Sequence, residues 1–191
     1  MAATKDEIAK KFMSLASRHG YRRTTIEDVV GALRISKKTV YDFFPTKAEL
    51  LRYSVELAAQ EQRRRVESML TENTAMGRVA QAVTFALADV RRFFEATPDP
   101  ELEPAEITAQ VNDHVFKPML RDLIAAGVAT GEFSVPDIDF TAACCLAVGM
   151  EAVRVIQEDP SRWPEGAALD AVRRLLSTVA DGPKVDGRDG G

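Results

Sequence analysis

The stretch TTIEDVVGALRISKKTVYDFFPTKAELL, residues 24–51, decides the fold because it holds the starts and stops of successive short helices. Thr24 followed three residues later by Glu27 has the pattern of a capping box, which predicts the start of a helix. The apolar residues that follow have helical spacing, namely Ile26, Val29, Val30 and Leu33. The first part of the stretch therefore predicts a short amphipathic helix.

A second short helix follows the tripeptide RIS. Ser36 is a favourable N-cap, and we expect Val40, Phe43 and Phe44 to form the buried side. Pro45 ends this helix, since the residue before a proline is pushed out of helical geometry. Thr46 with Glu49 forms another capping pattern and predicts a longer helix over about residues 47–71.

An amphipathic helix precedes the pair, with Ile8, Phe12, Leu15 and Ala16 on one face and Gly20 at its end. Two short helices on a supporting first helix make a helix-turn-helix, whose second helix enters the DNA major groove. If Val40 faces inward, the helical period turns five side chains outward: Lys37, Lys38, Thr39, Tyr41 and Asp42. The lysines suit phosphates and guanine edges, and the Thr39 hydroxyl and methyl suit a base edge or phosphate.

The charge distribution agrees with a nucleic-acid-binding segment. Residues 1–53 carry eleven Lys and Arg against six Asp and Glu, whereas the whole chain of 191 residues has a net charge of −4. The remainder is therefore acidic, and the basic part alone is attracted to polyanions. Chance clustering of solvated charge gives the same balance, so charge alone does not decide between the two interpretations.

The same residues resemble the N-terminal domain of TetR-type bacterial transcriptional regulators. The resemblance is carried by the paired threonines, the Ser-Lys start of the recognition helix, the Thr-hydrophobic-Tyr triplet and the aromatic-Phe-Pro-Thr-Lys exit, over residues 5 to about 53. The later segment GVATGEF also resembles the ligand-binding and dimerisation domain of this family, and the expected number of helices is similar. The resemblance implies a homodimer that binds double-stranded DNA at an inverted repeat and responds to a small-molecule effector.

The resemblance also implies site residues. Thr25 would bind a phosphate at a helix N-terminus, Tyr41 would donate to a phosphate, and Lys47 would hold the DNA backbone from the next helix. Phe44 would lock the recognition helix to the core. The implied DNA-binding set is Thr25, Ser36, Lys37, Lys38, Thr39, Tyr41 and Lys47.

Three residues depart from the family pattern. Arg34 stands where glycine is common, so a positive φ there would cost roughly 1 kcal/mol. Lys38 replaces a small residue and adds a possible base contact. Asp42 is unfavourable near phosphates unless it accepts from cytosine N4 or orients a lysine or arginine.

The rest of the chain has helical spacing over residues 75–96, 106–130, 137–159 and 167–180, with a break expected near Pro118. Residues 97–104 read as a proline-rich loop. The expected fold is all-α with about nine helices: a helix-turn-helix domain at 1–53, a ligand-binding and dimerisation domain at 54–180, and a disordered tail at 181–191. The basic run at 60–68 is interpreted as a solvated face.

Two sites are expected in the body if the resemblance extends there. A ligand pocket would be lined by Phe85, Phe93, His114, Phe116 and Met119, although all of these also suit an ordinary core. The apolar segment 138–156 and the last helix would form half of an intersubunit four-helix bundle, or else the centre of one subunit's core. The dimer residues on the first interpretation are Cys144, Ala147, Val148, Glu151, Val172 and Leu176.

Other classes of protein find little support in the sequence. It holds two histidines, no HExxH pair, no GxxxxGK loop and no apolar run long enough to span a bilayer, so we expect no enzyme, metal, cofactor or membrane partner. The adjacent Cys144 and Cys145 suit a reduced compartment, and we expect the cytoplasm. The sequence predicts a ligand-released repressor; a DNA-binding adaptor without an inducer and an all-helical enzyme remain as alternatives.

Overall fold

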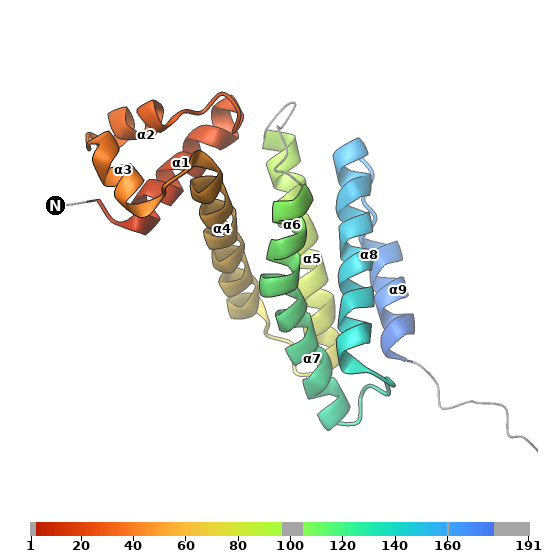
Figure 1. Ribbon diagram of the computed structural model, residues 1–191. Helices are drawn as coiled ribbons and strands as arrows, with labels where there is room; N and C mark the ends of the chain where they lie inside the picture. Colours follow the sequence, from red (N-terminus) through yellow and green to blue (C-terminus); the bar gives the residue numbers. More distant parts are fainter. Residues whose placement is uncertain (1–2, 97–104, 160, 178–191) are drawn as a thin grey trace, which may run out of the picture.

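The computed structural model describes residues 3–96, 105–159 and 161–177, and within them every regular element is a helix, as the sequence predicts (Figure 1). The predicted loop at 97–104 and the predicted tail at 181–191 lie outside the described residues. The elements are α1 (Lys5–His19), α2 (Ile26–Leu33), α3 (Lys37–Phe43), α4 (Lys47–Met69), α5 (Ala75–Ala96), α6 (Ala105–Val111), the π-helical η1 (Asn112–Phe116), α7 (Lys117–Ala129), α8 (Ile138–Glu158) and α9 (Glu165–Leu176).

Hydroxyl side chains start each of the first four helices. Thr4, Thr25, Ser36 and Thr46 each accept a hydrogen bond from the backbone N–H three residues on, which satisfies a donor that has no partner inside the helix. The predicted pair Thr24 and Glu27 is wrong by one residue, because the capping box of α2 is formed by Thr25 and Asp28. Thr24 is instead buried, and its hydroxyl donates to the Gly20 carbonyl at 2.9 Å.

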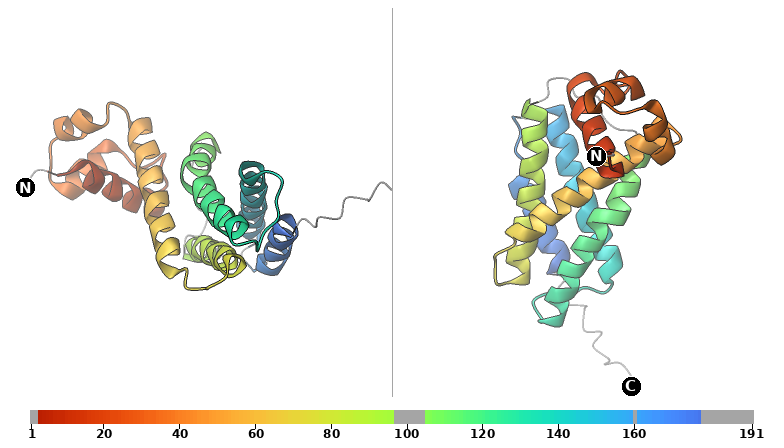
Figure 2. Two further views of the ribbon diagram at one scale, coloured as in Figure 1. Left: turned by 90° about the horizontal axis from the view of Figure 1, so that it is seen from below. Right: turned by 90° about the vertical axis from the view of Figure 1, so that its left-hand side faces the viewer.

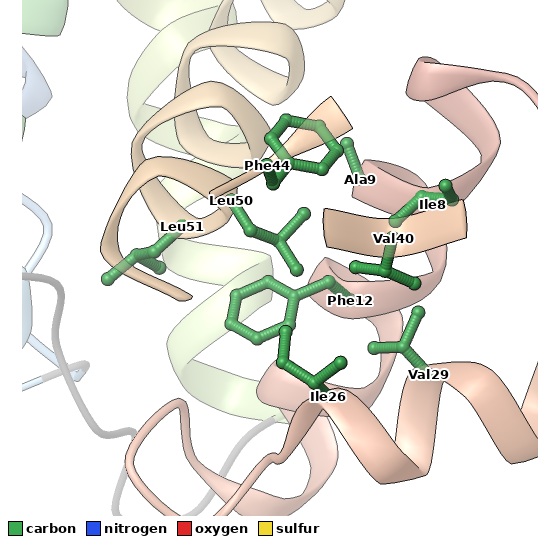
Figure 3. Close-up of a cluster of buried hydrophobic side chains, with 9 residues drawn as sticks. All are labelled: Ile8, Ala9, Phe12, Ile26, Val29, Val40, Phe44, Leu50 and Leu51. Atoms are coloured by element: carbon green, nitrogen blue, oxygen red, sulfur yellow. The ribbon is translucent and has the colours of Figure 1, made fainter. Parts of the chain in front are cut away.

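The N-terminal helices share one hydrophobic core with the first turns of α4 (Figure 3). Phe12 of α1 and Val40 of α3 are fully buried in it, and Phe44 is nearly so. The prediction that Phe43 is buried is wrong: its side chain is 41% exposed, because Val40 and Phe44, four residues apart, occupy the inward side of α3. The core comprises Ile8, Ala9, Phe12, Ile26, Val29, Val40, Phe44, Leu50 and Leu51.

The turn between α2 and α3 is built on a left-handed residue. Arg34 has φ 54° and ψ 45°, and its N–H donates to the Val30 carbonyl at the end of α2. Arg34, which stands where glycine is common, therefore has a Cβ in the strained left-handed region, as expected for a positive φ. The Arg34 side chain is exposed, so the guanidinium is not held by the core.

Helix α4 connects the N-terminal helices to the body (Figures 1 and 2). Its start belongs to the first core, whereas Ala59 and Val66 pack against the body. The basic run at 60–68 is only partly the solvated face that we predicted. Arg63 donates to the Val115 carbonyl at 3.3 Å, and Arg65 lies 3.7 Å from Asp89.

The body is a bundle in which α8 and α9 lie on the side away from α1–α3 (Figures 1 and 2). The break predicted near Pro118 takes the form of a π-helical segment, because the Lys117 N–H bonds to the Asn112 carbonyl five residues back. Pro118 then lies in the first turn of α7, where no intrahelical donor is needed. The chain direction is kept through the break.

The inner sides of α8 and α9 belong to the core of the subunit. Val172 and Leu176 are 1% and 0% exposed and pack in one cluster with Ala142 and Cys145. This corrects the prediction that Val172 and Leu176 lie in an intersubunit interface, because a side chain without exposed surface has nothing to offer a second subunit. Among the described residues no helix has the length and hydropathy needed to cross a bilayer.

Candidate nucleic-acid interface

Helix α3 is held against the N-terminal core by its inward side and leaves its other side open. Val40 anchors the middle of the helix and Phe44 anchors its end, where the ring lies 5.4 Å from the ring of Tyr53. Lys5 lies over the Tyr53 ring at 4.2 Å, and the Tyr53 hydroxyl donates to Asp6 at 2.6 Å. These contacts between α1 and α4 fix the orientation of the helix that would enter a groove.

The open side of α3 carries the residues that the sequence predicted there. Lys37, Lys38 and Tyr41 are exposed, and Thr39 is half-buried. Lys38 extends furthest, with 84% of its side chain exposed. The structure therefore brings four of the predicted DNA-binding residues together on one exposed helix face, beside Ser36.

Ser36 has a structural task at the start of this helix. Its Oγ accepts the Thr39 N–H at 3.0 Å and lies 2.9 Å from the Thr39 Oγ1. The two hydroxyls are thus hydrogen-bonded to each other at the N-terminus of α3. This arrangement leaves hydroxyl donors and acceptors at the helix end that faces DNA in helix-turn-helix proteins.

Lys37 forms an ion pair with Glu27 of α2. The hydrogen bond between them raises the pKa of Lys37 and lowers the pKa of Glu27. Both side chains are more than half exposed, so the pair is screened by solvent and contributes little stability. Its main effect is to offset one positive charge beside the recognition helix.

Lys38 and Asp42 form a second ion pair, within α3 itself. The Lys38 Nζ lies 3.0 Å from one Asp42 carboxylate oxygen and 3.4 Å from the other. Of the two roles expected for Asp42, contact with cytosine or with a cationic side chain, its carboxylate is seen in contact with a lysine. The four-residue spacing was a readable signal for this pairing, since such residues are neighbours on a helix.

Two more predicted residues flank α3. Thr25 caps α2 and donates its N–H and hydroxyl to Asp28 at 2.7 and 2.8 Å, which lowers the pKa of Asp28. Lys47, in the first turn of α4, donates to the Arg22 carbonyl at 3.0 Å. Lys47 thereby joins the start of α4 to the loop before α2, with two further N–H donors available to a phosphate.

Phe43 was predicted to be buried and is instead exposed at the end of α3. Its ring is exposed on α3, close in sequence to Tyr41 and Asp42. Apolar contacts with thymine methyl groups are part of major-groove reading, and an exposed phenylalanine ring has the chemistry to make them. The spacing gave no signal for this exposure, because residues at i, i+3 and i+4, such as Val40, Phe43 and Phe44, can share one side of a helix.

The predicted pocket residues separate into two places. Phe85, Phe116 and Met119 pack in one cluster with Val66 of α4 and Ala82 of α5. His114 is exposed and instead lines a separate cavity of about 210 Å³ with Arg52 and Glu56. Phe93 lies in α5, but its side chain is outside the described part of the chain. His114 is therefore not the polar group of the aromatic cluster that we expected.

The predicted dimer residues on α8 do reach the surface. Ala147 and Glu151 are exposed, and Cys144 and Val148 are half-buried. Phe140, which was not predicted, is the most exposed of the large apolar side chains at 69%. Phe140, Cys144, Ala147 and Glu151 fall at i, i+4, i+7 and i+11, so they share one side of α8.

Over residues 3–96, 105–159 and 161–177, no group of three or more His, Cys, Asp or Glu side chains is arranged to hold a metal ion. Burial raises the pKa of Cys145 to about 11, which keeps this thiol protonated and unreactive at neutral pH.

Together, α2 and α3, packed on α1 with the cationic side of α3 exposed, have the arrangement of a helix-turn-helix. The family described as "Bacterial regulatory proteins, tetR family" matches residues 13–53. No curated protein sequence matches the chain significantly. Residues 13–53 are thus similar to the DNA-binding part of tetR-family bacterial regulatory proteins.

Solved structures share the fold over nearly the whole chain. RolR in complex with resorcinol superposes with a TM-score of 0.69 at 18% identity, covering 92% of this chain and 88% of RolR. FadR from Thermus thermophilus in complex with lauroyl-CoA gives 0.67 at 15% identity, covering 98% and 100%. FadR from Bacillus subtilis in complex with stearoyl-CoA gives 0.65 at 14% identity, covering 90% and 97%.

Proposed function

We propose that this protein is a homodimeric repressor that binds an inverted-repeat operator and is released by a small-molecule ligand. The observation that carries the DNA-binding part is the exposed side of α3, where Lys37, Lys38, Thr39 and Tyr41 project from a helix fixed by its own core. Residues 1–53 would serve as the DNA-binding domain and residues 54–180 as the ligand-binding and dimerisation domain.

The roles of the individual residues follow from their positions. Lys37 and Lys38 supply positive charge to phosphates and guanine edges, and Thr39 and Tyr41 supply hydroxyls. Thr25 and Lys47 hold the DNA backbone from the starts of α2 and α4. Ser36 fixes the N-terminal end of α3.

The surface of α8 supports the dimer. Along its stripe Phe140, Ala147 and Glu151 are exposed and Cys144 is half-buried among the described residues, and Val148 borders it. Small and apolar side chains on an uncovered helix allow a second copy of the helix to approach closely. A two-fold axis there would present two α3 helices to half-sites one DNA turn apart, or a multiple of that.

The proposed ligand site is the aromatic cluster of Phe85, Phe116 and Met119, which packs between α4, α5 and α7. Asp89 lies one helical turn from Phe85, and its buried Oδ2 accepts no hydrogen bond among the described residues but lies 3.7 Å from Arg65. RolR was solved with resorcinol and two FadR proteins with acyl-CoA, which supports a ligand-responsive body without selecting a ligand. A ligand that favours one spacing of the α3 helices would change operator affinity.

The test is selection of fragments of the source genome by the purified protein at two salt concentrations. A shared inverted repeat that is still bound at the higher salt is the expected result. Enrichment without a common sequence, lost as salt rises, would leave only counterion-driven binding and refute the proposal.

A second measurement separates the repressor from an adaptor that has no inducer. Phenols and acyl-CoA thioesters are screened for thermal stabilisation of the protein, and each hit is added to the operator complex. We expect a stabilising compound to lower operator affinity and Phe116→Ala to weaken that response. Compounds that bind without changing operator affinity would favour the adaptor.

A further inference from the structure

Asp42 is a carboxylate on the helix that would enter the major groove. Its side chain is 58% exposed, and the described contacts assign it no part in the core or in a helix cap. Its two oxygens lie 3.0 and 3.4 Å from the Lys38 Nζ. The outward side of α3 therefore presents a negative and a positive group as one fixed pair.

A carboxylate in the groove weakens binding to most sequences for two reasons. The negatively charged backbone repels it, and it needs a hydrogen-bond donor on the base edge that it meets. In the major groove, cytosine presents the N4 amino group, from which Asp accepts. Guanine presents the O6 and N7 acceptors, to which Lys donates. A cation and an anion held side by side thus match a guanine and a cytosine that are close together.

The spacing along the helix agrees with neighbouring base pairs. Residues 38 and 42 are separated by roughly 6 Å along the helix axis, because each residue rises about 1.5 Å. Successive base pairs are about 3.4 Å apart, so this separation is slightly less than two steps. The distance between the charged groups themselves is shorter still.

We infer that Asp42 is a specificity-determining residue, which accepts from cytosine N4 beside a guanine bound by Lys38 within two neighbouring base pairs. This inference rests on the proposed function, since it requires sequence-specific DNA binding. Asp42 lowers affinity for sequences that lack the cytosine and thereby separates the operator from other DNA.

Glu27 provides a matched control for the negative charge. It also pairs with a lysine of α3, Lys37, but it lies on α2, in the first turn of that helix. Removing its charge reduces repulsion of the phosphates without removing a base contact. Glu27→Gln and Asp42→Asn therefore delete the same charge from two positions with different roles.

The experiment is selection from randomised duplex DNA with the full-length wild type, Asp42→Asn, Asp42→Ala and Glu27→Gln, followed by affinity measurements on the selected sites. We expect each wild-type half-site to contain neighbouring guanine and cytosine. Asp42→Asn should exchange the cytosine preference for adenine, since Asn pairs with adenine N6 and N7. Asp42→Ala should lose about tenfold in discrimination at that position, about 1.4 kcal/mol.

Glu27→Gln should bind all sequences more tightly and keep the wild-type motif. An unchanged motif with both Asp42 variants overturns this inference but leaves the proposed function standing. Loss of the guanine preference without any change at the cytosine position has the same meaning. If the wild type selects no motif at all, the proposed function fails together with the inference. Circular dichroism verifies that each variant is folded.

Discussion

Arg34 shows how one residue can be strained without disturbing the fold. It holds φ 54° at the end of α2, a conformation that L-residues other than glycine adopt at a cost of roughly 1–2 kcal/mol. Its side chain is exposed, so no buried contact repays that cost. We expect Arg34→Gly to raise the free energy of unfolding by about 1 kcal/mol in urea denaturation.

The matched control for this prediction is Arg34→Ala. Alanine removes the guanidinium but keeps the Cβ that causes the strain, so we expect little gain in stability. Equal stabilisation by glycine and alanine would show that the side chain and not the backbone is responsible.

Lys47 lies where a phosphate contact is expected, and its Nζ already donates to the Arg22 carbonyl at 3.0 Å. We expect Lys47→Ala to weaken binding on all DNA sequences and to lower the salt dependence of binding by about one counterion. Titrations at several salt concentrations measure this slope. Lys117→Ala on the body, where the lysine pairs with Asp113, should leave the slope unchanged; an equal change would contradict the assignment.

Single residues also show where a sequence is ambiguous. Thr24 and Thr25 both precede α2, and the pattern alone favoured the first, whereas the second accepts the Asp28 N–H at 3.2 Å. Thr24 is needed elsewhere, since its hydroxyl bonds to the Gly20 carbonyl. The choice between adjacent threonines thus depends on a contact with the preceding helix.

At the scale of elements, α5 is capped by a residue far away in the chain. The Glu132 carboxylate, in the loop after α7, accepts the Ala75 N–H at 2.9 and 3.0 Å and so satisfies the start of α5. These backbone hydrogen bonds lower the pKa of Glu132 below its ordinary value of 4.5. The ionised Glu132 carboxylate therefore stabilises the folded state fully above pH 4.5. This contribution to the free energy of unfolding is lost as the pH falls through the lowered pKa of Glu132.

We expect Glu132→Gln to lower the free energy of unfolding at pH 7 and to lower it by less at pH 3, because the contribution of the ionised carboxylate falls once the pH is below 4.5. Urea denaturation at both pH values measures the difference. Glu106→Gln, on the exposed surface of α6, is the control and should show no such pH dependence. A deficit of Glu132→Gln that is the same at both pH values would contradict the prediction.

At the scale of the whole molecule, α8 and α9 lie on the side away from the DNA-binding helices (Figure 2). An arginine in place of the exposed Ala147 would put a charge and a long side chain into the proposed interface. We expect Ala147→Arg to be a monomer in analytical ultracentrifugation, with weak binding to an inverted repeat and unchanged binding to a half-site. Ala126→Arg, exposed on α7, should remain a dimer; a dimeric Ala147→Arg would move the interface elsewhere.

The sequence by itself determined the helices and the similarity of residues 13–53 to tetR-family regulators, because helix caps, prolines and apolar spacing act over three or four residues. Ser36, Pro45 and the outward Lys38 were all predicted from such local patterns. Only the tertiary structure decided which of the candidate apolar residues are buried in the core. Val172 and Leu176 pack in the subunit core, Phe43 is exposed and Glu132 caps α5, because burial and capping here depend on contacts between helices distant in sequence.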